Sequence, residues 1–182
     1  MAHLTDSGAP TLERLNHLPA RDFVAALASI FEHSPWVAER VAPLRPFDSG
    51  PALHRAMCQA VLRAEERLQL ELIRAHPELA GRAALAGDLT RLSTQEQQRA
   101  GLSACTSSQL ARLRSLNAQY AERFGFPFVL AVRGHTVESV IEALAQRLTH
   151  GADDEREVAI REICRIAQFR LADLLAEPPG PA

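Results

Sequence analysis

The sequence contains no lysine, so that all 20 of its basic residues are arginine. Without a lysine amine, the chain cannot hold pyridoxal phosphate or a carbonyl substrate as a lysine Schiff base. The three cysteines, Cys58, Cys105 and Cys164, fit no metal-binding or redox spacing and are interpreted as buried core residues. The GxGxxG, P-loop and HExxH motifs are also missing. An enzyme with this sequence is expected to work without a metal or a nucleotide.

Long apolar runs and an excess of positive charge are missing as well. No stretch approaches the roughly 18 apolar residues that span a bilayer, and the N-terminus does not resemble a secretory signal. The formal net charge is -2, whereas nucleic-acid-binding domains usually carry a basic excess. Neither a membrane nor a nucleic acid is therefore an expected partner, and a soluble cytoplasmic protein is expected.

Apolar residues recur at helical spacing along most of the 182 residues. Only residues 126–132, FPFVLAV, look like a strand, and this stretch is short. The pattern predicts an all-α fold, a single compact multi-helix domain over residues 1–176 with a disordered tail at 177–182. Helices are expected within residues 21–34, 51–75, 107–124, 136–151 and 154–177.

His76 continues the apolar stripe of the second of these helices, eight residues after Leu68 and four after Leu72. Pro77 follows it and disfavours helical backbone at the preceding residue, so the helix should end there. The end of a helix raises the pKa of a histidine and burial lowers it, so this proton can move near neutral pH. His76 is a candidate acid or base. The alternative is a helix-ending histidine hydrogen-bonded to a carbonyl.

The stretch LSTQEQ places Ser93, Glu96 and Gln97 on one edge of a helical turn. These polar side chains could face a ligand. The same spacing is also the capping-box pattern, in which Ser93 begins the helix and Glu96 reaches back to its amide. Both interpretations remain open from the residues alone.

Glycine, proline and three phenylalanines crowd into residues 124–128. Pro127 could begin a new turn or helix, leaving the amides of Phe128, Val129 and Leu130 without helical acceptors and free to bind a carbonyl or an anion. The alternative is a tightly packed aromatic corner of the core.

Arg170 falls on the inward face of the last predicted helix. A guanidinium on an apolar stripe needs either a carboxylate partner or a ligand. Taken together, a histidine, an acid, an amide side chain, free backbone amides and an inward arginine suit a small, polar, anionic substrate.

Five segments, FEHSPWVAER, HPELAGR, LSTQEQ, LNAQYAERFGFPFVLAVRG and EICRIAQFRL, resemble the 2-oxo-4-hydroxy-4-carboxy-5-ureidoimidazoline (OHCU) decarboxylases. The resemblance runs from about Phe23 to Leu175. It implies an all-α enzyme without a cofactor that forms S-allantoin from a ureidoimidazoline in the last step of urate degradation. A cytoplasmic enzyme of bacterial type and a possible homodimer are also implied.

The resemblance assigns roles to the candidate residues. It makes His76 the catalytic acid or base and places Glu96 beside it, where Glu96 would fix the histidine tautomer. The remaining positions would bind the substrate, namely Pro77, Ser93, Thr94, Gln95, Gln97, Phe128, Val129, Leu130, Ala131, Val132 and Arg170. Two alternatives stay open, a hydrolase or lyase of a related ureide and an all-α interaction module in which FEHSPW and FGFPF form a docking patch.

Overall fold

A computed structural model describes residues 10–81 and 89–175. These residues form helices and no β-strand, which confirms the predicted all-α fold. None of the helices in these ranges is both long and apolar enough for a membrane span. The proposed tail at 177–182 lies outside the described residues, so the domain limits stay a prediction. The elements are α1 Leu12–His17, α2 Ala20–Leu27, α3 Trp36–Val41, η1 Ala42–Leu44, α4 Gly50–Leu62, α5 Glu66–Arg74, α7 Arg91–Arg99, η2 Leu102–Ala104, α8 Ser107–Phe124, α9 Val137–Arg147 and α10 Ala152–Leu175.

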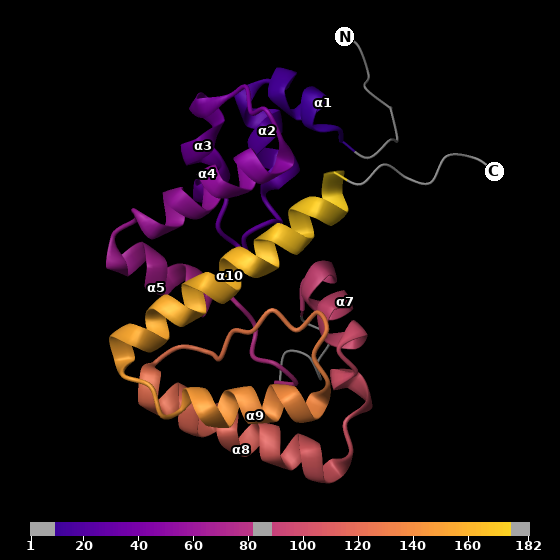
Figure 1. Cartoon of the computed structure of the whole chain (residues 1–182), viewed down its shortest axis with the longest axis vertical. Coiled ribbons are helices and arrows are strands. Elements are labelled where there is room, and N and C mark those ends of the chain that lie inside the picture. Colours follow the sequence, from indigo (N-terminus) through magenta and orange to yellow (C-terminus); the bar gives the residue numbers. More distant parts are fainter. Residues whose placement is uncertain (1–9, 82–88, 176–182) are drawn as a thin grey trace, which may run out of the picture.

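The long helix α10 organises the molecule (Figure 1). It runs diagonally between the N-terminal helices α1 to α5 and the pair formed by α8 and α9, and it packs directly on α4 and α5. Its apolar residues are buried along nearly the whole helix, for example Ala159, Ile163 and Leu171. A polar side chain on the buried face of this helix therefore faces other protein groups, and Arg170 is such a side chain.

The helix expected over residues 51–75 is divided into α4 and α5. Gln69 stabilises the break because its side-chain amide donates hydrogen bonds to the carbonyls of Val61 and Leu62, at the end of α4 (3.1 and 3.2 Å). The apolar stripe nevertheless stays buried on both sides of the break. The sequence pattern thus identified the buried face correctly and missed the interruption.

The helix expected over residues 21–34 ends earlier, at Leu27, and turns follow it. Ile30 and Phe31 are still buried, as the stripe predicted. His33 adopts a positive φ of 46°, an uncommon conformation for a residue other than glycine. Glu32, which directly precedes His33 in this turn, is buried in the interior.

Residues 126–132, called the extended segment below, belong to no helix and no strand. Helix α8 ends at Gly125, whose φ of 72° suits a residue without a side chain. Phe126 and Phe128 then pack edge-on against Tyr120, with ring centroids 6.0 and 5.4 Å apart. The new helix expected at Pro127 is therefore wrong, and the aromatic corner is observed. Because these rings are buried, they do not form an exposed docking patch.

The three cysteines are only partly buried, in contrast to the expectation that they fill the core. Two of them, Cys58 on α4 and Cys164 on α10, lie on helices that pack together. The wide separation of these residues along the chain concealed this neighbourhood.

Candidate active site

A pocket with about 630 Å³ of empty space, including its open mouth, lies between the turn after α5, helix α7, the extended segment and α10. Eleven of the thirteen predicted site residues line it, namely His76, Pro77, Ser93, Glu96, Gln97, Phe128, Val129, Leu130, Ala131, Val132 and Arg170. The other two, Thr94 and Gln95, line neighbouring cavities instead.

His76 is 5% exposed and lies just beyond the end of α5. Its Nδ1 is 2.9 Å from the carbonyl oxygen of Leu72. Because a carbonyl only accepts hydrogen bonds, Nδ1 must carry the hydrogen, and the lone pair of the neutral ring is on Nε2. Within the described ranges Nε2 makes no hydrogen bond, so it is available to a ligand.

Burial lowers the pKa of His76 to about 4, and the Leu72 hydrogen bond and the negative charge of Glu32 offset this shift only in part. Of the two opposing effects expected from the sequence, burial is the stronger. At neutral pH, His76 is therefore an uncharged base that holds its lone pair on Nε2.

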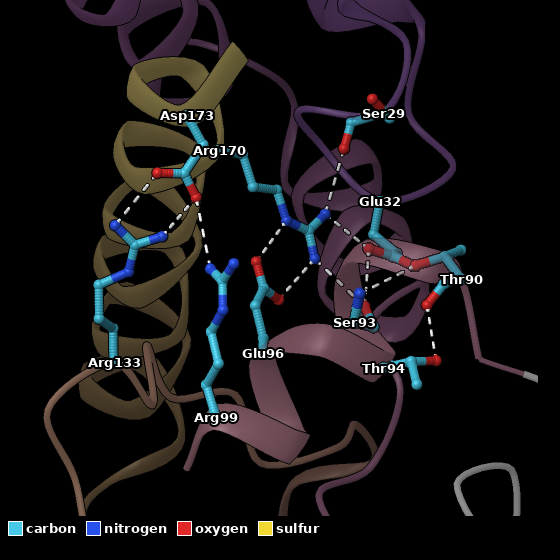
Figure 2. Close-up of polar contacts among 10 residues, drawn as sticks. All are labelled: Ser29, Glu32, Thr90, Ser93, Thr94, Glu96, Arg99, Arg133, Arg170 and Asp173. Atoms are coloured by element: carbon cyan, nitrogen blue, oxygen red, sulfur yellow. Dashed lines mark hydrogen bonds and ion pairs between the residues drawn. The ribbon is translucent and has the colours of Figure 1, made fainter. Parts of the chain in front are cut away.

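Arg170 is 4% exposed, and its guanidinium is fully occupied by protein acceptors (Figure 2). Nε and Nη2 donate to the two carboxylate oxygens of Glu96, both at 2.8 Å. Nη1 donates to Glu32 (2.7 Å) and to the Ser29 carbonyl (3.2 Å), and Nη2 also reaches the Ser93 hydroxyl (3.2 Å). The inward position was predicted, and carboxylates are its partners here.

Helix α7 begins at Arg91, with Thr90 as its cap, so the capping box expected at Ser93 is wrong. The hydroxyl of Thr90 accepts a hydrogen bond from the Ser93 amide, while the Ser93 hydroxyl donates to Glu32 (3.1 Å; Figure 2). The carboxylate of Glu96 accepts hydrogen bonds from Arg170. Nδ1 of His76 instead donates its hydrogen bond to the Leu72 carbonyl. The tautomer is thus set by the main chain and not, as expected, by Glu96.

Glu32 is a central residue of this cluster that the sequence analysis did not select. It is 3% exposed and accepts hydrogen bonds from Thr90 (2.6 Å), Ser93 and Arg170. Burial by itself would raise the pKa of Glu32, but these hydrogen bonds and the charge of Arg170 lower it overall. It is therefore an ionised acid, and its one sequence signal was its place in FEHSPW.

The pocket also presents donors that have no partner. Gln97 is 6% exposed, and its carbonyl accepts the amide of Ala80 (2.9 Å), which assigns the orientation of the side-chain amide. Its Nε2 is buried and makes no hydrogen bond within residues 10–81 and 89–175. A buried donor without an acceptor costs stability, so such a group commonly serves a ligand.

The extended segment contributes main-chain donors. Within the described ranges, the amides of Phe128, Val129, Leu130 and Val132 have no hydrogen-bond acceptor, whereas the Ala131 amide donates to Glu162 (2.8 Å). These amides are free because the segment pairs with no strand, not because a helix begins at Pro127.

A buried ion pair on the core side of the extended segment fixes its position. Arg147 donates to the Val129 carbonyl (2.6 Å), and its guanidinium lies over the Phe128 ring, 4.6 Å from the centroid. The same guanidinium pairs with Glu155, which also accepts the Tyr120 hydroxyl and contacts His150. The position of the pocket wall therefore depends on an ion pair in the core.

The described residues contain no cluster of three or more histidine, cysteine or acidic side chains arranged to hold a metal ion. The fold and the site together define an all-α protein whose pocket offers a neutral histidine and several hydrogen-bond donors to a small polar ligand.

Comparison with known proteins gives the family. The model of the OHCU decarboxylases matches residues 16–172, so the chain belongs to this family. It is 43% identical over 167 residues to the uric acid degradation bifunctional protein PucL of Bacillus subtilis (strain 168), covering 92% of this chain but 33% of that protein. It thus spans about a third of that relative. An OHCU decarboxylase of Haloferax volcanii is 42% identical over 163 residues, 90% of this chain and 95% of its own length.

The fold is shared with a solved relative. The crystal structure of an (S)-allantoin synthase matches with a TM-score of 0.75 and 30% identity, covering 91% of this chain and 54% of that one. The two chains therefore share the same overall helical fold.

Proposed function

We propose that this protein decarboxylates OHCU to S-allantoin, with His76 as the proton-transferring group. Its membership of the OHCU decarboxylase family supports the activity. The single structural observation that carries the mechanism is the neutral His76, with its unpaired Nε2 in the pocket. The resemblance implied an acid or base at this position, and the structure favours a base in the resting state.

The substrate is small and rich in carbonyl and amide groups. The unpaired Nε2 of Gln97 and the free amides of the extended segment are donors that match ring and ureido carbonyls. Donors fixed in place before the reaction stabilise developing negative charge without reorganisation, which commonly provides a large share of the rate. Pro77 and Phe128 would supply apolar contact beside them.

The reaction can be written so that every proton is accounted for. The ring carbon of the substrate that loses CO2 also carries a hydroxyl, and its neighbour carries the ureido group and a ring C=N bond. The electron pair left by CO2 forms a double bond between these two carbons, and the C=N nitrogen takes a proton from solvent. His76 Nε2 removes the hydroxyl proton, and the carbon with the ureido group then receives a proton on one face. His76 can both accept the first proton and deliver the second, as a general base and then a general acid.

Binding of the anionic substrate requires a change at Arg170, because its donors are all occupied. The Glu96 side chain is 25% exposed, whereas that of Glu32 is 2% exposed. Glu96 is therefore the partner that can move. Its displacement leaves Nε and Nη2 of Arg170 free to donate hydrogen bonds to a carboxylate or a carbonyl of the substrate. In this proposal Glu96 is displaced by substrate and then lies free beside the reacting groups.

The experiment that tests the function is circular dichroism of the allantoin formed from freshly generated OHCU, with and without the protein. Uncatalysed decay gives racemic allantoin, so the sign and size of the signal report the catalysed path and not the rate alone. A strong S-allantoin signal is expected. Racemic product at the background rate would overturn the proposal and return attention to a hydrolase or lyase of a related ureide.

The cytoplasmic setting and the homodimer implied by the resemblance belong to the same proposal. Cell fractionation and light scattering of the purified chain test them separately from the chemistry.

A further inference from the structure

Two cysteines and a histidine form a cluster outside the pocket. His54 and Cys58 are one turn apart on α4, and Cys164 is on α10, which packs against α4. Nε2 of His54 lies 2.8 Å from the Cys164 carbonyl oxygen and 3.2 Å from the Cys58 sulfur. The carbonyl can only accept, so Nε2 carries a hydrogen that faces both atoms. The Cys58 sulfur is then placed to accept from the same N–H group, a role that a thiolate fills better than a neutral thiol, whose sulfur is only a weak acceptor.

The charges of the cluster agree with this geometry. A hydrogen bond from the Cys164 thiol, together with His54, lowers the pKa of Cys58 to about 6 in spite of its burial. The contact with Cys58 raises the pKa of His54, although the nearby Arg55 acts in the opposite direction. Its hydrogen bond to Cys58 raises the pKa of Cys164, which therefore keeps its proton. The pair thus combines one nucleophilic sulfur with one protonated thiol beside it.

We propose that Cys58 and Cys164 are a peroxide-reactive dithiol that closes a disulfide between α4 and α10. The Cys58 thiolate attacks one oxygen of hydrogen peroxide, the O–O bond breaks, and Cys58 becomes a sulfenic acid while hydroxide leaves. The Cys164 sulfur then attacks the Cys58 sulfur, the S–O bond breaks, and the Cys164 proton leaves in water. Two thiols and one peroxide give one disulfide and two waters.

Access to the cluster suits a small uncharged oxidant. Both thiols are partly buried, and His54, which contacts the Cys58 sulfur, lines a cavity together with Arg55 and Gln168. Neither cysteine lines the pocket that contains His76. The dithiol is therefore a modification site separate from the proposed decarboxylase chemistry.

Cys105 provides a matched control within the same chain. Burial and the negative charge of Glu138 raise its pKa, so it is a thiol of ordinary or weaker reactivity. A comparison of the two sites in one sample removes differences in reagent, protein concentration and fold.

The first measurement is the pH dependence of alkylation by iodoacetamide at each cysteine, followed by peptide mass spectrometry. The rate at Cys58 should reach a plateau above roughly pH 7, while the rate at Cys105 should still rise through pH 9, because only the thiolate reacts. His54→Gln should move the Cys58 profile to higher pH and leave that of Cys105 unchanged. A Cys58 rate that climbs in parallel with Cys105 would overturn the assignment.

The second measurement follows the reduced protein treated with one equivalent of hydrogen peroxide at pH 7, in the presence of a chelator. Loss of two thiols, loss of two hydrogens in the intact mass and a Cys58–Cys164 peptide are expected. Cys105→Ser should give the same product, and Cys164→Ser should stop at a sulfenic acid that dimedone traps. Oxidation without this cross-linked peptide, in protein that retains its helical dichroism, would refute the proposal.

Discussion

At the scale of single residues, His76 divides its functions between its two ring nitrogens. Nδ1 is fixed by the Leu72 carbonyl, and Nε2 is left for chemistry. His76→Asn should keep a donor near that carbonyl but lose the base, so turnover should fall about 100- to 10,000-fold, the usual contribution of a general acid or base. The measurement is the initial rate of S-allantoin formation by circular dichroism.

An exposed histidine is the control for this change. His17, at the end of α1, does not line the pocket, and its Nδ1 lies 2.8 Å from the Glu13 carbonyl oxygen. His17→Asn should leave the rate unchanged. Near-normal turnover in His76→Asn with an unchanged melting temperature would remove His76 from the mechanism.

Glu96 gives a second prediction, which separates binding from chemistry. Glu96→Gln weakens the competitor for Arg170, so KM for the anionic substrate should fall or stay constant. At the same time kcat should fall at least about tenfold if the displaced carboxylate assists proton transfer. Steady-state kinetics give both constants.

Asp173→Asn serves as the control for Glu96→Gln, since Asp173 holds Arg133 and Arg99 and not Arg170 (Figure 2). It should leave kcat close to that of the unaltered protein. A Glu96→Gln variant that only melts lower, with both kinetic constants unchanged, would make Glu96 a structural partner of Arg170.

At the same scale, some site residues could be predicted from the sequence and others could not. His76 and Arg170 were selected because each is a polar side chain where an apolar one was expected, and Gln97 was selected for its spacing from Ser93 and Glu96. Glu32 gave no such contrast, because its burial results from a turn with positive φ at His33. Local spacing equally did not indicate that Glu96 would pair with Arg170 and not with His76. Contacts between residues that lie far apart in the sequence cannot be predicted from local spacing.

At the scale of elements, the helices were predictable and their ends were less so. Helix α8 spans the predicted residues, Ser107–Phe124, and Gly125 follows its end. The break between α4 and α5 was missed because a distant side chain, Gln69, stabilises it. Residues 126–132 have the composition of a strand, yet no partner strand exists in the described ranges, and the amides that this leaves free became part of the pocket.

That extended segment depends on the buried ion pair behind it. Arg147→Met would leave Glu155, which is fully buried, without its strongest partner and the Val129 carbonyl without a donor. Removal of one member of a buried pair typically costs about 3–5 kcal/mol of unfolding free energy. Urea unfolding should show a loss of this size, and KM should rise because the wall of the pocket loosens.

The matched control is Arg161→Met, because Arg161 pairs with Glu157 on the exposed face of α10. Such surface pairs contribute at most about 1 kcal/mol. Equal losses in the two variants would show that the core pair does not hold the segment.

At the scale of the whole molecule, the buried charges make stability depend on pH. His76 is folded in its neutral form with a pKa of about 4, whereas an unfolded histidine titrates near 6.5. Between these values the unfolded chain binds the extra proton, so stability increases as pH rises through this window. The pKa of Glu32 is lowered by folding, so its contribution is also lost as pH falls. Both groups act in the same direction.

The expected result is a steep loss of stability from pH 7 to pH 4, measured by urea unfolding at half-unit intervals. His76 alone should account for on the order of 3 kcal/mol of it, at about 1.4 kcal/mol for each unit of pKa. His76→Asn removes this part, so its stability should vary less between pH 6.5 and 4. Glu32 remains in that variant and should keep the residual slope below about pH 4.5. An identical pH dependence in both proteins would mean that His76 is not buried as a neutral base, and the proposed proton transfer would lose its starting state.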